Sequence, residues 1–470
     1  MESKSRFALF VGNRGMFPPE PIAQARREIP ELLRSWGHEV LVLPEDATRY
    51  GAVETTEEGQ IYARFLEEHR GEYDGVIVSL PNFGDENGAL AALQDAGVPI
   101  LVQAYPDELD KMSPALRRDA FCGKLSIMDL FVQAGVKFST LKPHVVSPQD
   151  PRFAEAIDHF DRVCRVTKGL SRMVVGAIGA RTTAFKTVRV DEVALQRAGI
   201  TMETLDLSAV FARVKEVSED MPAFAAKKQE LAGVASWEAV PESAMNQLTR
   251  LAVVLDEIID EYQLDALAIR CWDEMEQQLG VAPCVLLGAL NDAGIPAACE
   301  VDVAGAIAMH ALSLASGQAA TLLDWNNNYG DDDDKCILFH CGPVPASLMQ
   351  GQGRVTDHAI LANAVGEGRS YGPSQGRIAP TDMTYAGLLT QNGCLRFYVG
   401  EGRFTDDPIA DDFFGCAGVA EIAGLQDVLV HLGKAGFRHH VSATPGHVMD
   451  AVAEALGYYL GHEVDVFRCK

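Results

Sequence analysis

The sequence predicts an α/β protein in which two Rossmann-like parallel-sheet domains are followed by a β-rich C-terminal domain. In the first third, short apolar runs alternate with helical patterns, which is typical of βαβ units and a parallel sheet. A second alternating region begins near residues 150–170. In the last third glycine becomes frequent and short strand patterns dominate. We therefore expect domains at residues 1–170, 171–345 and 346–470.

Four apolar strands are expected in the first region, with helical patterns between them. The strands are Phe7–Val11, Glu39–Leu43, Gly75–Ser79 and Pro99–Gln103, and the helical patterns cover 21–36, 59–68 and 88–96. The first strand runs into Gly12-Asn13-Arg14-Gly15, and the third runs into the loop Pro81–Glu86. Because ligands of parallel sheets bind at the carboxyl ends of the strands, a small ligand is expected near these two loops.

The second region repeats this pattern and the last region departs from it. Expected elements of the second region are the strands Met173–Ile178, Asp265–Ile269 and Gly294–Ala298, a long helical region at 222–262, and an apolar helix at 304–315. The last region contains short strands such as Arg396–Val399 and closes with a helix at 447–460. This change of pattern is the basis for a β-rich third domain.

Composition and charge restrict the partners of the chain. Its net charge of −26 would repel phosphate backbones and anionic lipid, so neither nucleic acid nor a membrane is an expected partner. The run Phe7–Val11 is too short for a signal-peptide core, and no apolar run reaches about 18 residues. The 10 cysteines include no CxxC pair. We expect free thiols in a reducing cytoplasm rather than a zinc ribbon.

Two segments place carboxylates after apolar strands. Cys299-Glu300-Val301-Asp302 follows one such strand, although its two acids would also suit the positive end of the helix that comes next. The strand that begins at Thr321 ends in Asp324, Trp325 and three asparagines. An aromatic face beside a carboxylate and amides is typical of sugar sites, whereas an ordinary polar turn is the alternative.

Two further segments supply histidines. His340 closes the apolar strand Ile337–Phe339, and His439 and His440 lie together near the end of the chain. Taken singly, such histidines are more often satisfied core or surface residues than ligands. If the adjacent pair lies in a strand, its side chains point to opposite faces, so only one of them could bind an ion. Two acids and histidines from separate segments suit an ion such as Mn²⁺.

In these residues the sequence resembles the L-fucose/L-arabinose isomerase superfamily, over essentially the whole chain. The matching segments are Val11–Pro18, Pro81–Glu86, Cys122–Ser126, Gly176–Arg181, Ala184–Arg189, Cys271-Trp272, Ala298–Asp302, Asp324–Asn326, His340 and His439-His440. The resemblance implies an aldose–ketose isomerase that assembles as a homotrimer or homohexamer. It implies Mn²⁺, or Co²⁺ or Mg²⁺, held by Glu300, Asp324 and His440, with His340 as a further ligand. Glu300 and Asp324 would also act as the catalytic acid–base pair.

The same resemblance implies substrate contacts from two parts of the chain. In this family, loops of the first domain approach the site of a neighbouring subunit, so Arg14, Asn82, Phe83, Asp85 and Glu86 are expected contacts across an interface. An ion pair within its own domain is the alternative for Arg14. The other expected contacts are Lys186, Cys271, Trp272, Trp325, Asn326 and His439. Lys186 stands where a small polar residue is common and would suit an anionic sugar, unless it forms a surface salt bridge.

The expected reaction proceeds through an enediolate of an open-chain sugar. Candidate substrates are L-fucose, D-arabinose, L-arabinose, and sulfonated or phosphorylated hexoses. Asp324 matches the fucose branch of the family, whereas His340 matches the arabinose branch. Because the chain mixes features of both branches, neither branch identifies its substrate. Two alternatives remain open, namely a non-catalytic cytoplasmic sugar-binding protein and a metal-dependent aldolase or dehydratase.

Overall fold

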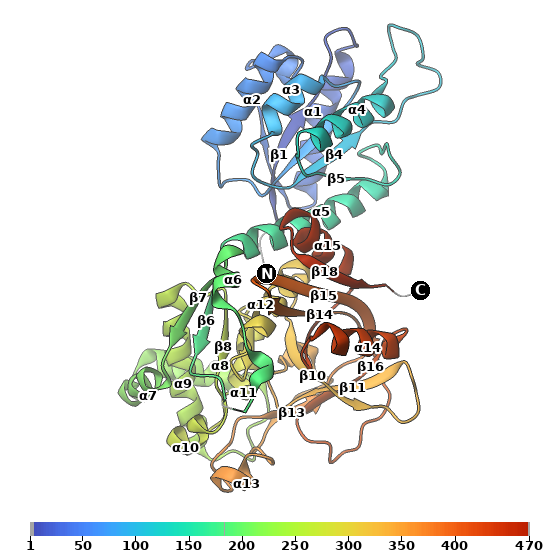
Figure 1. Ribbon diagram of the computed structural model, residues 1–470. Coiled ribbons are helices and arrows are strands. Elements are labelled where there is room, and N and C mark those ends of the chain that lie inside the picture. The colour runs from blue at the N-terminus through green and yellow to red at the C-terminus, as the bar shows by residue number, and fades with distance from the viewer. Residues whose placement is uncertain (1–3, 183, 469–470) are drawn as a thin grey trace. The chain divides into compact units, whose positions relative to one another are not determined.

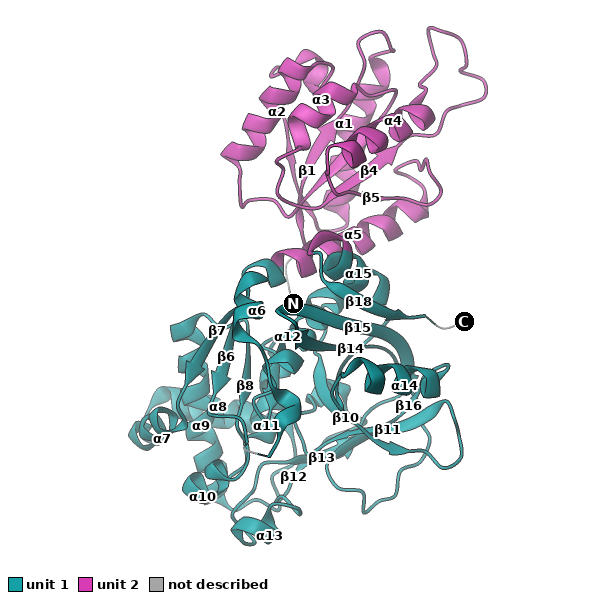
Figure 2. Ribbon diagram, viewed as in Figure 1, with its two compact units in different colours: residues 1, 169–457, 461–470 teal, residues 2–168, 458–460 magenta. Residues whose placement is uncertain are grey.

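The structure, a computed structural model, describes residues 4–182 and 184–468 and divides into two compact units (Figure 2). The N-terminal unit ends at Lys168 and takes in Tyr458–Leu460, and the C-terminal unit comprises Gly169–Gly457 and the chain from Gly461 onward. Residues 1–3, at the start of the first expected domain, and residues 469–470, at the end of the last, lie outside the described residues, and Cys469 is among them. All cysteines of the described residues are free thiols.

The N-terminal unit is built on a parallel sheet with strand order β2-β1-β3-β4-β5 (Figure 1). Its elements are β1 (Arg6–Val11), α1 (Glu20–Ser35), β2 (Glu39–Val42), η1 (Arg49–Gly51), α2 (Thr56–Glu68), β3 (Gly75–Leu80), α3 (Glu86–Leu93), β4 (Ile100–Ala104), α4 (Ala120–Gln133), β5 (Ser139–Thr140) and α5 (Pro151–Ser171). Apolar side chains of β1 alternate between two cores. One core includes residues of α1 and α5, and the other includes residues of α2, α3 and α4. Helices thus cover both faces of the sheet, which explains the apolar strands.

The C-terminal unit begins with a second parallel sheet, in the order β7-β6-β8-β9. Its elements are β6 (Val174–Ile178), η2 (Lys186–Val188), α6 (Glu192–Arg197), β7 (Thr201–Leu205), α7 (Leu207–Glu216), α8 (Pro222–Val234), α9 (Glu242–Tyr262), β8 (Ala266–Ile269), α10 (Glu274–Leu279), α11 (Cys284–Asp292), β9 (Ala297–Cys299) and α12 (Val303–Ser316). The helical region expected at 222–262 consists of two helices, because the backbone turns extended at Ala235 and α9 begins only at Glu242.

A nine-stranded sheet completes the C-terminal unit, in the order β12-β13-β16-β11-β10-β17-β14-β15-β18. Its strands are β10 (Thr321–Asn328), β11 (Lys335–His340), β12 (Arg354–Val355), β13 (Ser374–Arg377), β14 (Thr381–Gln391), β15 (Cys394–Phe404), β16 (Cys416–Glu421), β17 (His440–Pro445) and β18 (Glu463–Phe467). An additional pairing of β15 with β16 closes the middle of this sheet into a ring. Strands from both sides of residue 345 share the sheet, and the three-domain division of the chain stays a prediction.

Short helices connect these strands, namely η3 (Ala346–Leu348), α13 (Ala362–Val365), α14 (Leu425–Ala435), α15 (Met449–Ala453) and the π-helix η4 (Glu454–Tyr459). The expected closing helix therefore begins at Met449 and changes to π-helical geometry. Two parallel sheets followed by a β-rich region confirm the predicted α/β class. Among the described residues, no helix combines the length and apolar character needed to cross a membrane.

Candidate active site

A strained turn after β9 positions the first carboxylate of the site. Glu300 and Val301 both have a φ of 59°, which is left-handed backbone geometry. Side chains with a β-carbon adopt it at a cost, and a β-branched valine rarely adopts it at all. Strain of this kind is typical of functional sites. Here the turn leaves the Glu300 side chain buried and in contact with histidines of β11 and β17.

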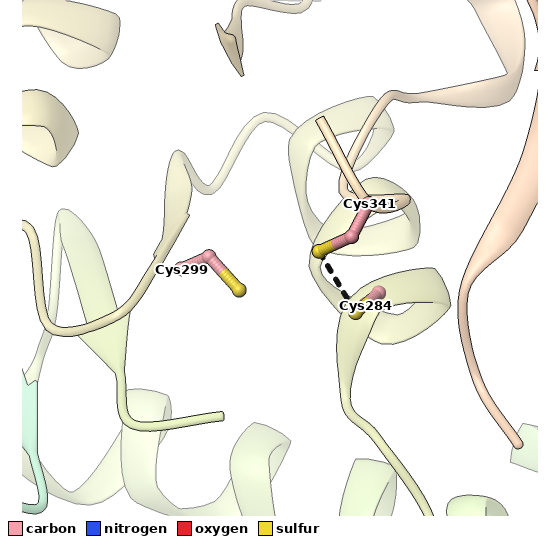
Figure 3. Close-up of side chains that lie close together, drawn as sticks. All are labelled: Cys284, Cys299 and Cys341. Atoms are coloured by element: carbon pink, nitrogen blue, oxygen red, sulfur yellow. Dashed lines mark hydrogen bonds between the residues drawn. The ribbon is translucent and has the colours of Figure 1, made fainter. Parts of the chain in front are cut away.

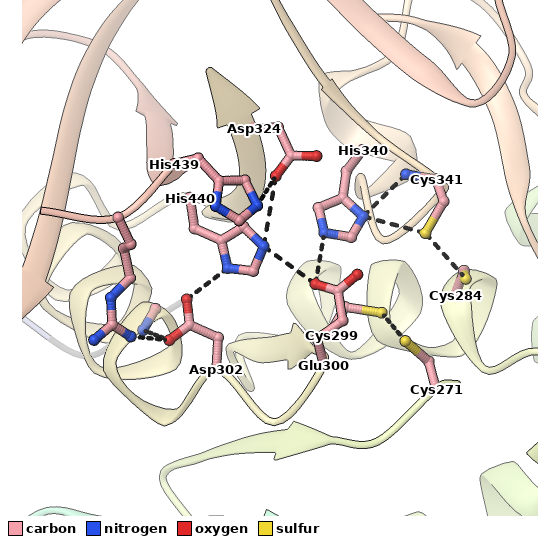
Figure 4. A network of polar contacts seen from close by, with 12 residues as sticks. Cys271, Cys284, Cys299, Glu300, Asp302, Asp324, His340, Cys341, His439 and His440 are labelled. Carbon is pink, nitrogen blue, oxygen red and sulfur yellow. Dashed lines mark hydrogen bonds and ion pairs between the residues drawn. The ribbon is translucent and has the colours of Figure 1, made fainter. Parts of the chain in front are cut away.

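The nine-stranded sheet supplies the other members of the cluster. Asp324 in β10 lies opposite His440, the first residue of β17, and His340 is the last residue of β11. Nε2 of His440 lies 3.1 Å from Oε2 of Glu300 and 3.5 Å from Oδ1 of Asp324. Nε2 of His340 lies 3.5 Å from the same Glu300 oxygen. Figure 4 shows these four side chains pointing toward one another.

The cluster contains polar atoms that are suited to an ion. Within the described residues, Oε2 of Glu300, Oδ1 of Asp324 and Nε2 of His340 are buried without a hydrogen-bond partner. Leaving such an atom unpaired costs about 1–3 kcal/mol, so a group of three converging on one place needs a reason. Ligand atoms of Glu300, His340 and His440 lie within 4.8 Å of one another. Carboxylates and imidazoles held on strands fit Mn²⁺ or a similar divalent ion.

The two carboxylates differ in their electrostatics. Burial acts to raise the pKa of Glu300, but the charges of His340 and His440 outweigh it and lower that pKa to about 2. For Asp324, burial raises the pKa above its ordinary value against the opposing effect of the same histidines. Environments that push the pKa values of two carboxyl groups apart in this way are typical of acid–base sites.

Asp302 fixes the orientation of His440. Its Oδ2 lies 2.7 Å from Nδ1 of His440, and its Oδ1 accepts hydrogen bonds from Arg438 at 2.6 Å and from the backbone of Gly305 at 3.0 Å. A carboxylate on Nδ1 leaves Nε2 free to face Glu300, as in many metal sites. Asp302 is also the N-cap of α12, so the helix-start alternative holds for this acid, whereas Glu300 faces the cluster.

Nδ1 of His340 lies beside a cysteine sulfur, whereas Nδ1 of His440 lies beside the Asp302 carboxylate. Nδ1 of His340 is 3.2 Å from Sγ and 2.9 Å from the backbone nitrogen of Cys341. The backbone N–H of Cys341 donates to Nδ1, so Nδ1 acts as an acceptor in this contact. The two histidines of the cluster are thus both held through Nδ1.

Known proteins match this chain at both ends. The N-terminal domain of fucose/sulfoquinovose isomerase matches residues 8–171, and the C-terminal domain of L-fucose isomerase matches residues 338–468. This chain belongs to the fucose isomerase-like superfamily. Fucose and sulfoquinovose isomerases are aldose–ketose isomerases, which confirms the enzyme class expected from the sequence.

Three curated relatives are named sulfoquinovose isomerase. One from Priestia aryabhattai is 26% identical over 326 residues, which cover 68% of this chain and 70% of the relative. One from Alkalicoccus urumqiensis is 24% identical and covers 61% and 63%. One from Clostridium sp. (strain MSTE9) is 25% identical and covers 68% and 71%. Among solved structures, a periplasmic sugar-binding protein of Legionella pneumophila is 12% identical over 66% of this chain and 93% of its own chain. Its TM-score is 0.16.

In this chain, the residues that were expected from the first-domain loops form a cluster within the N-terminal unit. Arg14 forms an ion pair with Glu86, and its guanidinium lies 4.2 Å from the centre of the Phe83 ring. Asn82 is buried and donates a hydrogen bond to the carbonyl of Pro18. Asp85 caps α3 by accepting a hydrogen bond from the backbone of Gly88. The ion-pair alternative for Arg14 is present, and the substrate role of these residues stays a prediction.

The remaining expected contacts lie in the C-terminal unit. His439 and His440 do not both lie in a strand, because β17 begins only at His440, so the expected alternation of faces does not apply to them. Nε2 of His439 lies 3.6 Å from Oδ1 of Asp324, and the two rings are 4.6 Å apart. Trp325 is half-buried and Asn326 is exposed at the end of β10. Their substrate roles stay predictions.

Phe185 is a neighbour of the cluster that the sequence analysis missed. Its ring centre lies 5.4 Å from those of Trp272 and His439 and 5.7 Å from that of His440. Lys186, the next residue, is exposed. Phe185 falls within one of the segments that resemble the family, but an isolated aromatic gives no local signal of a site. Arg438, which holds Asp302, was missed although it directly precedes the histidine pair.

Proposed function

We propose that this chain is a metal-dependent aldose–ketose isomerase that acts on an open-chain anionic sugar, with sulfoquinovose as the first candidate. Ligand atoms of the buried side chains of Glu300, His340 and His440 lie within 4.8 Å of one another. Those of Asp324 and His439 form a second group with the same His440, which supports an ion site. The names of the curated relatives support the sulfonated substrate.

Glu300, Asp324, His340 and His440 would hold a divalent ion, which polarises the sugar carbonyl and the adjacent hydroxyl and so acidifies the proton between them. Glu300 and Asp324 are the candidate proton carriers, as the family resemblance implies. One carboxylate takes the proton from the second carbon and returns it to the first, while the hydroxyl proton moves from the oxygen on the second carbon to the oxygen on the first. Mass and carbon count are therefore unchanged, which distinguishes isomerisation from aldol cleavage and dehydration.

A basic cavity beside the cluster supports an anionic substrate. Its volume is about 410 Å³, and Lys186, Arg189 and Arg438 line it together with Asp191. Arg438 also bonds Asp302, so the cavity borders the residues that hold His440. Cations in such a cavity favour a sulfonate or phosphate group.

The deciding experiment is an isomerisation assay of the purified protein with EDTA or with added Mn²⁺. The panel contains sulfoquinovose, glucose 6-phosphate, L-fucose, D-arabinose and L-arabinose. We expect Mn²⁺-dependent formation of the ketose from the sulfonated sugar, at least about 100-fold slower in Glu300→Gln than in the exposed-acid control Asp333→Asn. Turnover that persists in EDTA, or in Glu300→Gln with metal bound, would contradict the assignment.

The basic cavity has its own test. Removal of one charge-assisted contact, in Lys186→Ala, should raise KM for the anionic sugar about 10-fold or more and leave KM for a neutral sugar unchanged. An equal effect on both sugars would place the sulfonate elsewhere. Mn²⁺ as the native ion, the trimer or hexamer, and the cytoplasmic location stay predictions.

A further inference from the structure

Four buried thiols gather beside the carboxylate–histidine cluster. Cys271 follows β8, Cys284 begins α11, Cys299 ends β9 and Cys341 follows β11. Their exposed fractions are 2%, 1%, 0% and 8%. They come from four separate segments of the C-terminal unit, so their meeting is a product of the fold and not of a local sequence motif.

The sulfur atoms are arranged as in a metal site. Sγ of Cys284, Cys299 and Cys341 lie within 4.8 Å of one another, and Cys284 and Cys341 are 3.7 Å apart (Figure 3). In a tetrahedral zinc–thiolate site the Zn–S bonds of about 2.3 Å separate neighbouring sulfurs by about 3.8 Å. The sulfur of Cys271 lies 3.0 Å from that of Cys299.

We propose that Cys284, Cys299 and Cys341 bind one thiophilic divalent ion of the zinc type. Thiolates are soft donors, unlike the oxygen and imidazole donors of the neighbouring cluster. The two sets would therefore select different ions. Binding involves no oxidation or reduction, because each ligating thiol forms a bond to the ion and releases its proton to solvent.

The start of α11 is a feature that favours a thiolate at Cys284. Cys284 is the first residue of α11, whose N-terminal end carries partial positive charge.

The proposed ion would tie the two sheets of the C-terminal unit together. Cys299 closes the four-stranded sheet and precedes Glu300, and Cys341 follows His340 at the end of β11 in the nine-stranded sheet. An ion bonded to both sulfurs fixes the backbone on which Glu300 and His340 stand. The role of this ion is structural and is separate from the proposed isomerase reaction.

The test uses the full-length protein loaded with Co²⁺ as a probe for zinc. We expect a thiolate-to-cobalt charge-transfer absorption, and about one zinc per chain retained after dialysis against EDTA. Oxygen and imidazole ligands give no such absorption. The charge-transfer band therefore reports on the thiol site alone, independently of the isomerase site and of turnover. In Cys284→Ser the absorption should be lost, whereas the control Cys336→Ser, a buried thiol on β11, should keep it.

A second measurement needs no variant, which covers the case that Cys284→Ser fails to fold. A mercurial that titrates the thiols of the wild-type protein should release zinc in step with loss of the buried thiols. Absence of the thiolate absorption in the wild type, its survival in Cys284→Ser, or titration of these thiols without release of zinc would each overturn the proposal.

Discussion

A single carboxylate, Asp302, connects the histidine of the cluster to the basic cavity. It holds Nδ1 of His440 and the guanidinium of Arg438, whose side chain is 7% exposed. Burial acts to raise its pKa, but Arg438 and His440 hold that pKa well below the ordinary value. Asp302 thus stays ionised, and its charge keeps both partners in place.

Asp302→Asn should lower the affinity for Mn²⁺ by about 10- to 100-fold, because Asn holds His440 without a charge. The free energy of unfolding should also fall, by about 3–5 kcal/mol, since the buried Arg438 loses its counter-charge. Calorimetric Mn²⁺ titration of folded protein measures the first effect. Asp331→Asn, in an exposed loop, is the control. An unchanged affinity would mean that Asp302 acts only as a helix cap.

Glu276 in α10 is buried with neither carboxylate oxygen bonded within the described residues. Burial raises its pKa to about 8, and the charges of Asp273 and Glu274 act in the same direction. Between the ordinary pKa and this value, the folded protein keeps a proton that the unfolded chain releases. Stability is therefore greatest below the unfolded pKa and falls as the pH rises through the folded value.

Glu276→Gln should remove this dependence. Its Tm should exceed that of the wild type by about 4 °C or more at pH 8.5 and match it near pH 5, because Gln keeps the shape without the ionisable group. Differential scanning calorimetry across pH measures the effect. Glu238→Gln, at an exposed position outside this helix, is the control. A Tm difference independent of pH would show that Glu276 has an ionic partner.

At the scale of elements, the hairpin of β14 and β15 supports the strand that carries His440. Tyr385 lies opposite Gly400 and Tyr398 lies opposite Gly387. A β-carbon on Gly387 would approach the Tyr398 ring to 2.3 Å, and one on Gly400 would approach the Tyr385 ring to 2.4 Å. Each glycine therefore makes room for the tyrosine across from it. Both tyrosines are fully buried.

Gly387→Ala should lower the free energy of unfolding by about 1–3 kcal/mol, because the added methyl group displaces a packed ring. Gly433→Ala is the matched control. That glycine lies in α14 with open space around it, so alanine should raise stability by about 0.5–1 kcal/mol. Chemical denaturation of both variants measures the difference. A neutral Gly387→Ala would mean that the hairpin moves to accept the side chain.

At the scale of the whole molecule, candidate site residues lie in both compact units. Arg14 and Phe83 belong to the N-terminal unit, and Glu300, Asp324 and His440 belong to the C-terminal unit. The family resemblance implies that the first set serves the site of a neighbouring subunit. This implication makes activity a property of the assembly, and it can be tested by mixing subunits.

Arg14→Ala and Glu300→Gln should each be inactive alone, and a mixture of the two, dissociated and reassembled together, should recover activity. Mixed oligomers would contain sites with an intact Arg14 from one subunit and an intact Glu300 from another. Steady-state turnover of the mixture against each parent measures the effect, and separately reassembled parents are the control. No recovery in mixed oligomers of confirmed composition would place both residues in one subunit's site.

Local sequence patterns determined the architecture of this protein. Alternation of apolar runs with helical patterns predicted both parallel sheets, because each such element reports its own burial. One exception is the helical region at 222–262, which consists of the two helices α8 and α9. The order and spacing of Glu300, Asp324 and His440 contributed to the resemblance that singled them out, and the structure places His440 beside both carboxylates.

Only the tertiary structure decided which side chains support them. Asp302 and Arg438 meet across 136 positions of sequence, and Cys284 and Cys341 across 57. Neither pair has a motif, because each depends on how the four-stranded sheet faces the nine-stranded sheet. The sequence alone therefore determined the fold class and the candidate ligands. The register and packing of the strands decided the bonds that hold them and the thiol cluster beside them.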